Sequence, residues 1–508
     1  MNQVKFIDTT IRDGAASLWA MNMRTGHMLS VIEQLDAAGF DQMEFFAPGS
    51  RLKKFVRHLG EDPWQWVKMG AALAERTDLR WHGGVRSTRM SGHFSPAVAD
   101  LLIEKAVELG IRHTRAGSNW NDAEVTRDDK ERLERLGMTT VIDVIYSVSP
   151  KHTDSYYVEK VREVAALRPW RVCLKDVGGL LTPERTRELL PRLIAETGDV
   201  EWEFHGHCNN GLAPLNALEA VKAGVRYVHT AVPPLANGDS QPSAYNVAAN
   251  LRALGYDVDL DDRALEPVTR YLSAVADREG FPKGVPNEYD QNLYTHQIPG
   301  GMISNFVYQL EQVGMAHRLG EMMEETARVR AEYGYPIMVT PLSQIVATQA
   351  AINVITGERY RQVTDESIHY AWGRHGGEEA TSGMDPEVRA HILDRPRGRE
   401  LEHWDSPDPS LAELRARFGE GVSDEELILR AIVGDDAAEV VRNAGTPQLI
   451  PAVGPRTGQP LTALLQALIQ DHGHRHIAIS KGALSVTITR GAQGARPAAS
   501  PVASEVPA

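Results

Sequence analysis

Cysteine is almost absent from this sequence, and other features that mark special classes of protein are missing too. The 508 residues include only Cys173 and Cys208, so a disulfide framework is excluded and a reducing cytoplasm is the expected compartment. No run approaches about 18 uninterrupted apolar residues, and the first residues form no apolar signal segment, so we expect no membrane association. The net charge of -14, without a prominent basic patch, argues against nucleic-acid and anionic-membrane surfaces.

What the sequence does contain is enough apolar residues, 42% of the chain, to bury a large core. Its first half alternates short apolar runs with amphipathic helical stretches. The runs expected to be strands are 4–8, 40–46, 79–85, 111–117, 139–147, 170–177, 200–207 and 225–232. Eight strands, each followed by a helix, are typical of a (β/α)8 barrel, an α/β fold whose active site lies at the C-terminal ends of the strands.

The C-terminal ends of these predicted strands are rich in polar side chains. They carry Asp8, Asp13, Glu44, His82, Arg115, Asp143, Tyr146, Lys175, Asp176, His205, His207 and His229. A single polar residue in such a place is ordinary for a loop. Because the ends of all eight strands meet at one mouth of the barrel, the joint pattern favours an active site.

The pair His205 and His207 carries the most chemical information. Residues two apart in a strand point to the same side, so both imidazoles are expected to face the barrel mouth, where they can hold one divalent ion. A carboxylate from Asp13 would complete a ligand set that leaves open positions for a substrate. Lys175 is the exception, because an ammonium group cannot bind a cation. It is expected to be a salt-bridge partner, a substrate contact, or a lysine converted by CO2 into an anionic carbamate.

A series of longer blocks carries a family resemblance. They read DTTIRDGAASLWAMNMRT (8–25), GEDPW (60–64), SPKHTDSYYV (149–158), LKDVGGLLTP (174–183), HGHCNNGLAPLNALEAVKAG (205–224), SQPS (240–243), HQIPGGMISNF (296–306), YGYPIMVTPLSQIVATQAAINVITGERY (333–360) and GVSDEELILRAIV (421–433). Over residues 4–440 the chain resembles the carboxyltransferase region shared by pyruvate carboxylase, the α subunit of oxaloacetate decarboxylase and the small-substrate subunit of transcarboxylase.

This resemblance implies roles for particular residues. Asp13, His205 and His207 would bind a divalent metal such as zinc, manganese or cobalt, with Lys175 as a carbamylated fourth ligand. Arg12 would lie beside the substrate's carbonyl group, and Arg115 would bind its carboxylate through a planar fork. The chemistry would pass through a pyruvate enolate, whose negative oxygen needs a Lewis acid and a cationic neighbour.

The chain also departs from the family pattern beside these residues. Where the family motif has alanine, histidine and glutamine after the metal-binding aspartate, this sequence has Gly14, Ala15 and Ala16. Just before the SQPS block, Asp239 occupies the position of a threonine that relays a proton between substrate and biotin. Aspartate is a competent base, but it donates a proton only if its pKa is raised. Substrate choice and biotin handling are therefore expected to differ from those of the family.

Partners follow from what the chain lacks. The sequence contains neither a biotin-accepting lysine between two methionines nor a phosphate-binding loop of the GxxxxGK type. If biotin is used, a separate biotin carrier protein and biotin carboxylase must supply it. The resemblance also implies a homodimer.

Four segments are expected along the chain. Residues 1–285 form the barrel and 286–445 a mainly helical domain. A small α/β extension of one helix and two strands follows at 446–490, and 491–508 is an Ala/Pro/Ser-rich flexible tail. The HGHRH stretch at 472–476 is interpreted as a solvated loop rather than a metal site.

Three hypotheses for function remain. The first is a metal-dependent carboxyltransferase or decarboxylase that acts on pyruvate, oxaloacetate or a related 2-oxo acid with biotin supplied by another chain. The second is a biotin-independent lyase or condensing enzyme that uses the same enolate, with Asp239 as base. The third is a non-catalytic component of a carboxylase complex.

Overall fold

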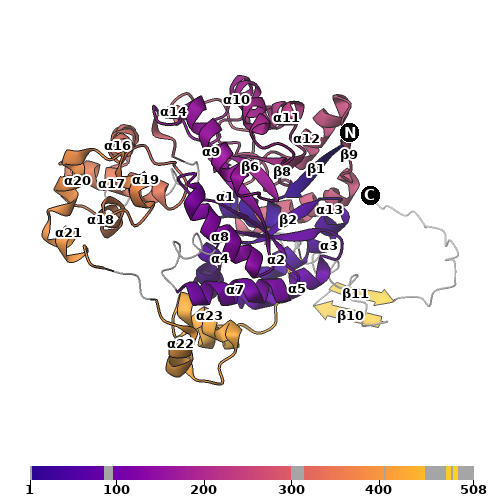
Figure 1. Ribbon diagram of the computed structural model, residues 1–508. Helices are drawn as coiled ribbons and strands as arrows, with labels where there is room; N and C mark the ends of the chain where they lie inside the picture. The colour runs from indigo at the N-terminus through magenta and orange to yellow at the C-terminus, as the bar shows by residue number, and fades with distance from the viewer. Residues whose placement is uncertain are drawn as a thin grey trace, which may run out of the picture. The chain divides into compact units, whose positions relative to one another are not determined.

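Eight parallel strands close into a barrel at the centre of the protein, as the alternating pattern predicted (Figure 1). Their bounds are β1 Gln3–Asp8, β2 Gln42–Phe46, β3 Asp78–His82, β4 His113–Ala116, β5 Thr139–Ile145, β6 Arg171–Asp176, β7 Glu201–Gly206 and β8 Tyr227–Thr230. The barrel closes because β1 pairs on one side with β8, Lys5 opposite Tyr227, and on the other with β2, Ile7 opposite Gln42. A two-residue strand, β9 (Asp257–Val258), pairs with the start of β1.

The computed structural model describes residues 3–84, 95–298, 310, 314–404, 408–451, 476–481 and 484–489. Helices follow the strands and lie around them in Figure 1. Those of the barrel are α1 Ala15–Trp19, α2 Thr25–Leu29, α3 Ile32–Ala37, α4 Pro48–Lys54, α5 Pro63–Leu73, α7 Pro96–Glu108, α8 Ala123–Arg135, α9 Asp154–Ala166, α10 Pro183–Ala195, α11 Ala213–Ala223, α12 Ala244–Ala253 and α13 Asp262–Glu279, with π-helical turns η1 Thr10–Gly14 and η2 Phe55–Leu59. Several begin at a residue whose side chain accepts a backbone N–H, as Asp122 does for α8 and Thr182 for α10.

The barrel core is formed where the apolar faces of the helices pack on the strands. The strands are buried along nearly their whole length, which explains why they appear as continuous apolar runs rather than as alternating ones. Trp66, Trp81 and Trp202 are fully or almost fully buried there. Such large side chains fix the strands, and therefore the side chains at the strand ends, in one arrangement.

The second half of the chain is mainly helical, in agreement with the sequence pattern. Its helices are α14 Leu293–His296, η3 Ala316–Arg318, α16 Leu319–Glu332, α17 Leu342–Thr356, α18 Asp365–Ala371, α19 Gly377–Thr381, α20 Pro386–Leu393 and α21 Pro396–Glu400. Apart from α14, whose Leu293 belongs to the barrel core, they share a core of their own, to which Val329, Tyr333, Val346 and Tyr370 contribute. Of the predicted helical domain, residues 299–309, 311–313 and 405–407 lie outside the described residues.

The last helices before residue 450 return to the barrel. They are α22 Leu411–Phe418, α23 Asp424–Val433 and α24 Ala437–Ala444. Leu427 and Ile428 of α23 belong to the barrel's apolar core, and Lys105 of α7 forms an ion pair with Asp424 at 3.1 Å. These contacts attach α23 to the barrel.

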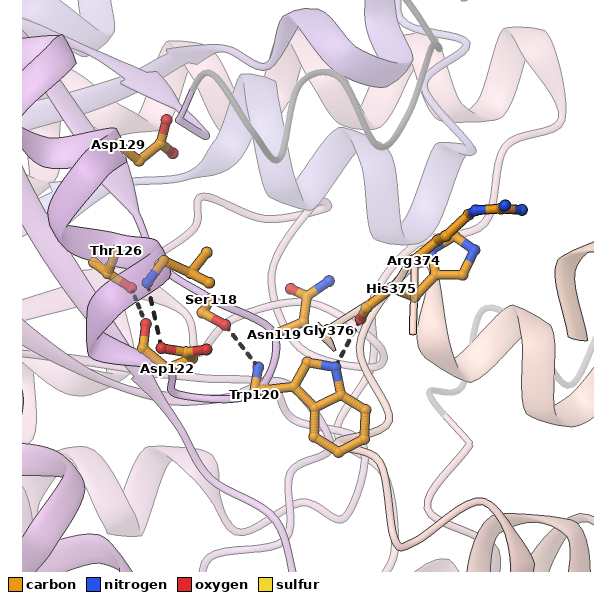
Figure 2. Close-up of a pocket in the computed structure, with 11 residues that line it drawn as sticks. Ser118, Asn119, Trp120, Asp122, Thr126, Asp129, Arg374, His375 and Gly376 are labelled. Atoms are coloured by element: carbon orange, nitrogen blue, oxygen red, sulfur yellow. Dashed lines mark hydrogen bonds between the residues drawn. The ribbon is translucent and has the colours of Figure 1, made fainter. Parts of the chain in front are cut away.

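The helical part contacts the barrel at the loops after β4 and β5. Trp120 donates a hydrogen bond from Nε1 to the carbonyl oxygen of His375 at 2.8 Å, and Lys151 pairs with Glu379 at 3.0 Å. Figure 2 shows this contact beside a cavity of about 60 Å³. Small-molecule sites have about 300 Å³ or more, so this cavity is a packing feature of the contact rather than a substrate pocket. A Cβ on Gly376 would lie 2.2 Å from Trp120 Nε1, which explains glycine there.

Because of His152, in the loop after β5, we expect the free energy of unfolding to fall in acid. It is buried, and burial with Arg330 and Lys151 nearby lowers its pKa from 6.5 to about 3. Below pH 6.5 the unfolded chain therefore binds a proton that the folded chain refuses, and stability falls as the pH drops toward 3. Relative to a His152→Asn variant, wild type should lose about 2 kcal/mol of unfolding free energy between pH 7 and pH 5.

Urea unfolding of both proteins at the two pH values measures this difference. Asp8, whose pKa burial raises to about 7, acts in the opposite direction but is common to both proteins and cancels. An unchanged difference between wild type and variant at pH 7 and pH 5 would contradict the prediction.

Residues 451–508 form a separate unit. Two antiparallel strands, β10 His476–Lys481 and β11 Leu484–Thr489, lie in the segment where two strands were expected. The helix predicted before them, most of the HGHRH loop and the tail at 491–508 lie outside the described residues. Among the described residues, no helix has both the length and the apolar content needed to cross a membrane.

Candidate active site

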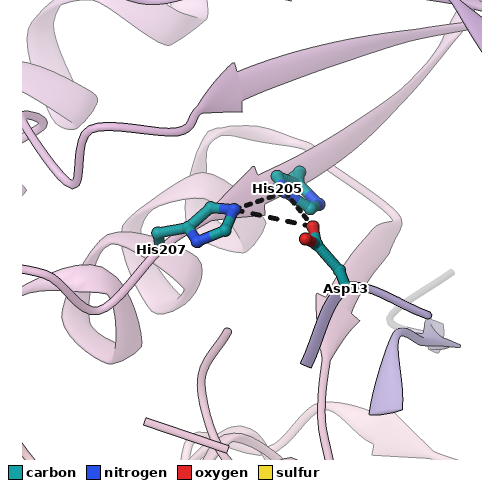
Figure 3. A group of neighbouring side chains, drawn as sticks. All are labelled: Asp13, His205 and His207. Carbon is teal, nitrogen blue, oxygen red and sulfur yellow. Dashed lines mark hydrogen bonds and ion pairs between the residues drawn. The ribbon is translucent and has the colours of Figure 1, made fainter. Parts of the chain in front are cut away.

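Three side chains from the first and seventh strands meet at the mouth of the barrel (Figure 3). Asp13 lies on the π-helical turn η1 directly after β1, His205 lies in β7, and His207 follows the end of β7. Oδ2 of Asp13 is 3.2 Å from Nε2 of His205 and 3.5 Å from Nε2 of His207, and the two imidazole nitrogens are 3.2 Å apart. The expectation that both imidazoles face the same side is therefore correct, and the three atoms could hold one cation.

The tautomer of His207 is set by a backbone contact. Its Nδ1 lies 2.7 Å from the carbonyl oxygen of Asp239. A carbonyl can only accept, so Nδ1 carries the proton and, in the neutral ring, Nε2 keeps a lone pair directed at Asp13.

The tautomer of His205 is set by a longer chain of buried groups. Nε2 of His229 donates to the carboxylate of Glu203 at 3.0 Å, which leaves Nδ1 of a neutral His229 as an acceptor. That nitrogen lies 3.1 Å from Nδ1 of His205. The proton of His205 is therefore on Nδ1, and its Nε2 lone pair also faces Asp13. Such partners typically orient histidine ligands of metals.

The charges at Asp13 and His205 suit metal binding, whereas at His207 the Asp13 carboxylate outweighs burial and raises the pKa of the imidazole. Burial would raise the pKa of Asp13, but Arg12 and His207 hold it well below its usual range. Burial, reinforced by Arg115, lowers the pKa of His205. Asp13 is thus ionised and His205 neutral near pH 7, which are the protonation states that metal ligands require.

Arg12 and Arg115, predicted to bind substrate, are held by buried carboxylates. Nε of Arg12 donates to Glu44 at 2.7 Å, and its Nη2 is 3.0 Å from Asp13. Arg115 is fully buried and pairs with Glu44 at 2.7 Å and with Asp143 at 3.2 Å. Arg12 thus borders the metal-binding group, whereas Arg115 lies among carboxylates of the barrel interior. Its contact with a substrate carboxylate stays a prediction.

Lys175 and Asp239, the other two predicted site residues, also lie in this region. Lys175 of β6 is opposite His205 in register, and its Nζ is 3.0 Å from Oδ2 of Asp143. Asp239, in the loop after β8, is partly buried, and burial raises the pKa of its carboxyl group. The backbone carbonyl group of Asp239 accepts the hydrogen bond that orients His207, and this contact does not depend on the side chain of Asp239.

Some polar strand-end residues have structural partners instead. Asp176 accepts the backbone N–H groups of Leu180 and Leu181 at 2.9 and 2.8 Å. Tyr146 stacks on Tyr157, with ring centroids 5.4 Å apart. These contacts stabilise the loops after β5 and β6. They account for the presence of Asp176 and Tyr146 at the strand ends without a catalytic role.

Two further groups of possible ligands lie deeper in the barrel, among the described residues. They are Glu44 with His205 and His229, and Cys173 with Glu203 and His229. Both carboxylates are already neutralised, Glu44 by two arginines and Glu203 by Arg80, which pairs with it through two contacts of 2.7 Å. A cation there would meet guanidinium groups, so Asp13, His205 and His207 are the favoured metal group.

Sequence reasoning missed Glu203 and Gln241. Glu203 is two residues before His205 in the same strand, so the strand period alone could have placed it on the same face. Gln241 lies in the SQPS block, and its Nε2 is 3.0 Å from both Asp13 Oδ2 and His207 Nε2. No signal other than that block pointed to it.

Comparison with known proteins shows which families and relatives the chain resembles. Residues 3–271 match a family model described as HMGL-like, and residues 293–467 match one described as a conserved carboxylase domain. The chain is 34% identical to a pyruvate carboxylase subunit of Methanocaldococcus jannaschii over 77% of this chain and 68% of that protein. It is 32% identical to the pyruvate carboxylase subunit of the same name from Methanothermobacter thermautotrophicus over 84% of this chain and 75% of that protein.

More distant similarities extend to a protein named for another substrate and to solved structures. The 2-oxoglutarate carboxylase large subunit of Hydrogenobacter thermophilus is 29% identical over 85% of this chain and 67% of that protein. Among solved structures, the carboxyl transferase domain of Rhizobium etli pyruvate carboxylase superposes with a TM-score of 0.79 at 23% identity, covering 89% of this chain and 79% of that one. The structural likeness shows that the fold is shared.

Proposed function

Because the chain belongs to the HMGL-like family and is related to the two pyruvate carboxylase subunits, we propose a function of the same kind. It is the metal-dependent carboxyltransferase component of a biotin-dependent enzyme that acts on a 2-oxo acid. The observation that carries the proposal is the meeting of Asp13, His205 and His207 at the barrel mouth, with their lone pairs directed at one point. Pyruvate and oxaloacetate are the substrates proposed first, with 2-oxoglutarate as the related alternative because one relative is named for it.

The ligand set suits a divalent ion. Two imidazoles and one carboxylate are compatible with zinc, manganese or cobalt. Such an ion would polarise the substrate's carbonyl oxygen as a Lewis acid. Asp13, His205 and His207, called the triad from here on, are all buried. Their burial excludes bulk water and strengthens every electrostatic interaction at the site.

The residues around the triad would divide the remaining work. Arg12, held 3.0 Å from Asp13, would stabilise negative charge on the substrate's enolate oxygen. Lys175 and Arg115 would add positive charge facing an anionic 2-oxo acid. Asp239, with its raised pKa, would exchange a proton with the substrate's C3 or with biotin. The carboxyl group would move to or from that C3.

The proposed partners are a biotin carrier protein and a biotin carboxylase. The two relatives from Methanocaldococcus jannaschii and Methanothermobacter thermautotrophicus are each named as one subunit of pyruvate carboxylase, which supports a carrier supplied by another chain. Whether the net reaction runs as carboxylation or decarboxylation is set by those partners. A homodimer is proposed from the family resemblance.

Asp13→Ala should abolish the first chemical step. Exchange of the C3 protons of pyruvate with D2O, followed by proton NMR on protein loaded with Zn²⁺ or Mn²⁺, measures enolate formation without any carrier. We expect a fall on the order of 100-fold or more, because a Lewis acid contributes several kcal/mol. Asp41→Asn, at the opposite end of the barrel where Asp41 pairs with Lys5 at 2.8 Å, is the matched control. Equal exchange by wild type and Asp13→Ala would refute the proposal.

A second assay, decarboxylation of oxaloacetate with and without biotin, separates the alternative functions when it is combined with proton exchange. Decarboxylation that requires free biotin or a biotinylated carrier supports the carboxyltransferase. The main alternative is a biotin-independent lyase or condensing enzyme with Asp239 as base, a role that its raised pKa also allows. Proton exchange that is lost in Asp239→Asn, together with turnover indifferent to biotin, would favour that alternative. Bound metal without exchange or turnover would favour a non-catalytic component of a complex.

A further inference from the structure

Arg51, on the helix after β2, has a buried guanidinium group without an acidic partner. It lies in α4 and is 1% exposed, and no carboxylate oxygen of the described residues is within ion-pair distance of it. Its Nη1 faces the sulfur of Met28 at 3.6 Å, and its Nε has no hydrogen-bond partner. Burial and the nearby Arg12 lower its pKa to about 9, which leaves it protonated at pH 7. A buried cation of this kind costs free energy, so stability alone does not explain an arginine here.

The second terminal nitrogen of Arg51 binds the backbone on both sides of Arg12. Nη2 donates to the carbonyl oxygen of Ile11 at 2.6 Å and to that of Arg12 at 2.9 Å. These two carbonyl groups belong to the peptide units that flank the Cα atom of Arg12. Because each peptide unit is planar, holding both of them fixes the direction in which the side chain of Arg12 leaves the backbone.

The other end of Arg12 is held by the strand that leads to α4. Nε of Arg12 donates to the carboxylate of Glu44 in β2 at 2.7 Å. Only Ala47 separates the end of β2 from the start of α4. One short segment of chain therefore holds both the backbone and the guanidinium group of Arg12.

Asp13, the next residue, has anchors of its own. The backbone N–H groups of Asp13 and Gly14 both donate to the carbonyl oxygen of Thr9 at 2.9 Å. The carboxylate of Asp13 also lies against the two histidines of the triad. Loss of Arg51 should therefore displace Arg12 far more than Asp13.

We propose that Arg51 is a positioning residue that acts on the reaction through Arg12, because it fixes the backbone from which the Arg12 guanidinium group reaches the negative oxygen of the enolate. This inference rests on the role of Arg12 in the proposed function. A group that stabilises charge only as the enolate forms contributes to kcat rather than to KM. A displacement of such a group by about 1 Å can lower the rate on the order of 100-fold.

A double-mutant cycle measures whether Arg51 acts through Arg12. The rate is that of exchange of the C3 protons of pyruvate with D2O, on full-length protein loaded with Zn²⁺. Arg51→Met should lower kcat about 10- to 100-fold and leave KM within about twofold of wild type. Arg12→Gln should itself lower exchange on the order of 100-fold. In that background Arg51→Met should lower the rate by less than about twofold more, because the group that it displaces is gone.

Metal affinity separates an effect on Arg12 from an effect on the metal-binding group. Competition for Zn²⁺ against a chelating indicator measures it. In Arg51→Met the affinity should change less than about 10-fold, the smallest effect typical of losing a group that supports a metal ligand. A variant that merely loosened the whole barrel mouth would lose metal affinity together with the rate.

Arg330→Met is the matched control. Arg330 is also buried and donates to backbone carbonyl groups, at 3.1 Å to both Pro336 and Val148, but these contacts lie in the loops after α16 and β5. It should exchange protons like wild type, and thermal unfolding of every variant verifies folding.

Arg51→Lys keeps the inference testable if Arg51→Met does not fold. Lysine keeps the buried charge but replaces the planar fork by a single ammonium group. Exchange should therefore fall less than in Arg51→Met, and the fall should again disappear beside Arg12→Gln.

Three outcomes would overturn the inference about Arg51. The first is wild-type exchange in both of its variants, and the second is an equal fall with and without Arg12. The third is a loss of Zn²⁺ affinity as large as the loss of exchange, because Arg51 would then act through Asp13. Failure of the proposed function is distinguishable, since Asp13→Ala would then exchange protons as fast as wild type.

Discussion

Replacing Glu44 by glutamine is expected to lower the free energy of unfolding by about 3 to 5 kcal/mol. Glu44 is fully buried and contacts the guanidinium groups of both Arg12 and Arg115. Burial would raise its pKa, but the two arginines hold it well below the usual range, so the carboxylate is ionised in the folded protein. Glutamine keeps the shape and one acceptor but leaves two buried cations without their shared counter-charge. Urea unfolding at pH 7 measures the loss.

Glu425→Gln is the matched control for Glu44→Gln. Glu425 pairs with Lys68 at 2.7 Å, but Lys68 is exposed and Glu425 only half-buried, and pairs open to solvent contribute under about 1 kcal/mol. Similar losses in the two variants would mean that the network around Glu44 is no more important than a surface ion pair. That result would also remove the reason for regarding Arg12 as rigidly held beside the triad.

The sequence was sufficient for much of the fold because each strand and helix carries its own apolar pattern. All eight barrel strands were predicted, and closure of the barrel then brought residues as far apart as Asp13 and His205 together. Packing between distant elements is a different matter. The amphipathic pattern of α23 shows that Leu427 and Ile428 are buried, but only the structure shows that they join the barrel core.

The site was partly predictable, because the predicted C-terminal ends of the strands identify which polar residues lie at the barrel mouth. They do not show which of these residues pair with one another. Arg115 was expected to be available to substrate because its planar fork suits a carboxylate, and in the structure Glu44 and Asp143 occupy that fork. Pairings of this kind depend on distances between different strands, which periodicity does not contain. The supporting groups Glu203 and Gln241 were missed because neither residue type is unusual in a strand or loop.

Replacing His229 by phenylalanine is expected to weaken metal binding about 10- to 100-fold, the usual effect of losing the partner of a metal-binding histidine. His229 does not touch the triad's centre. Its Nδ1 accepts the proton of His205 at 3.1 Å, and Glu203 fixes that state by accepting from Nε2 at 3.0 Å. Without an acceptor at this position, His205 can place its proton on Nε2, the nitrogen that the metal needs. Competition for Zn²⁺ against a chelating indicator measures the change.

His229→Asn distinguishes this positioning role from simple packing. The side-chain oxygen of asparagine can replace Nδ1 of His229 as acceptor, although its contact with Glu203 is lost, so this variant should keep most of the wild-type affinity. His113→Phe is the control for loss of an imidazole, because His113 lies at the start of β4, stacks on Trp170 and has no contact with the triad. Equal weakening in His229→Asn and His229→Phe would contradict the proposed role. Retained affinity in His229→Asn would show that Glu203 affects metal binding only through the tautomers of His229 and His205.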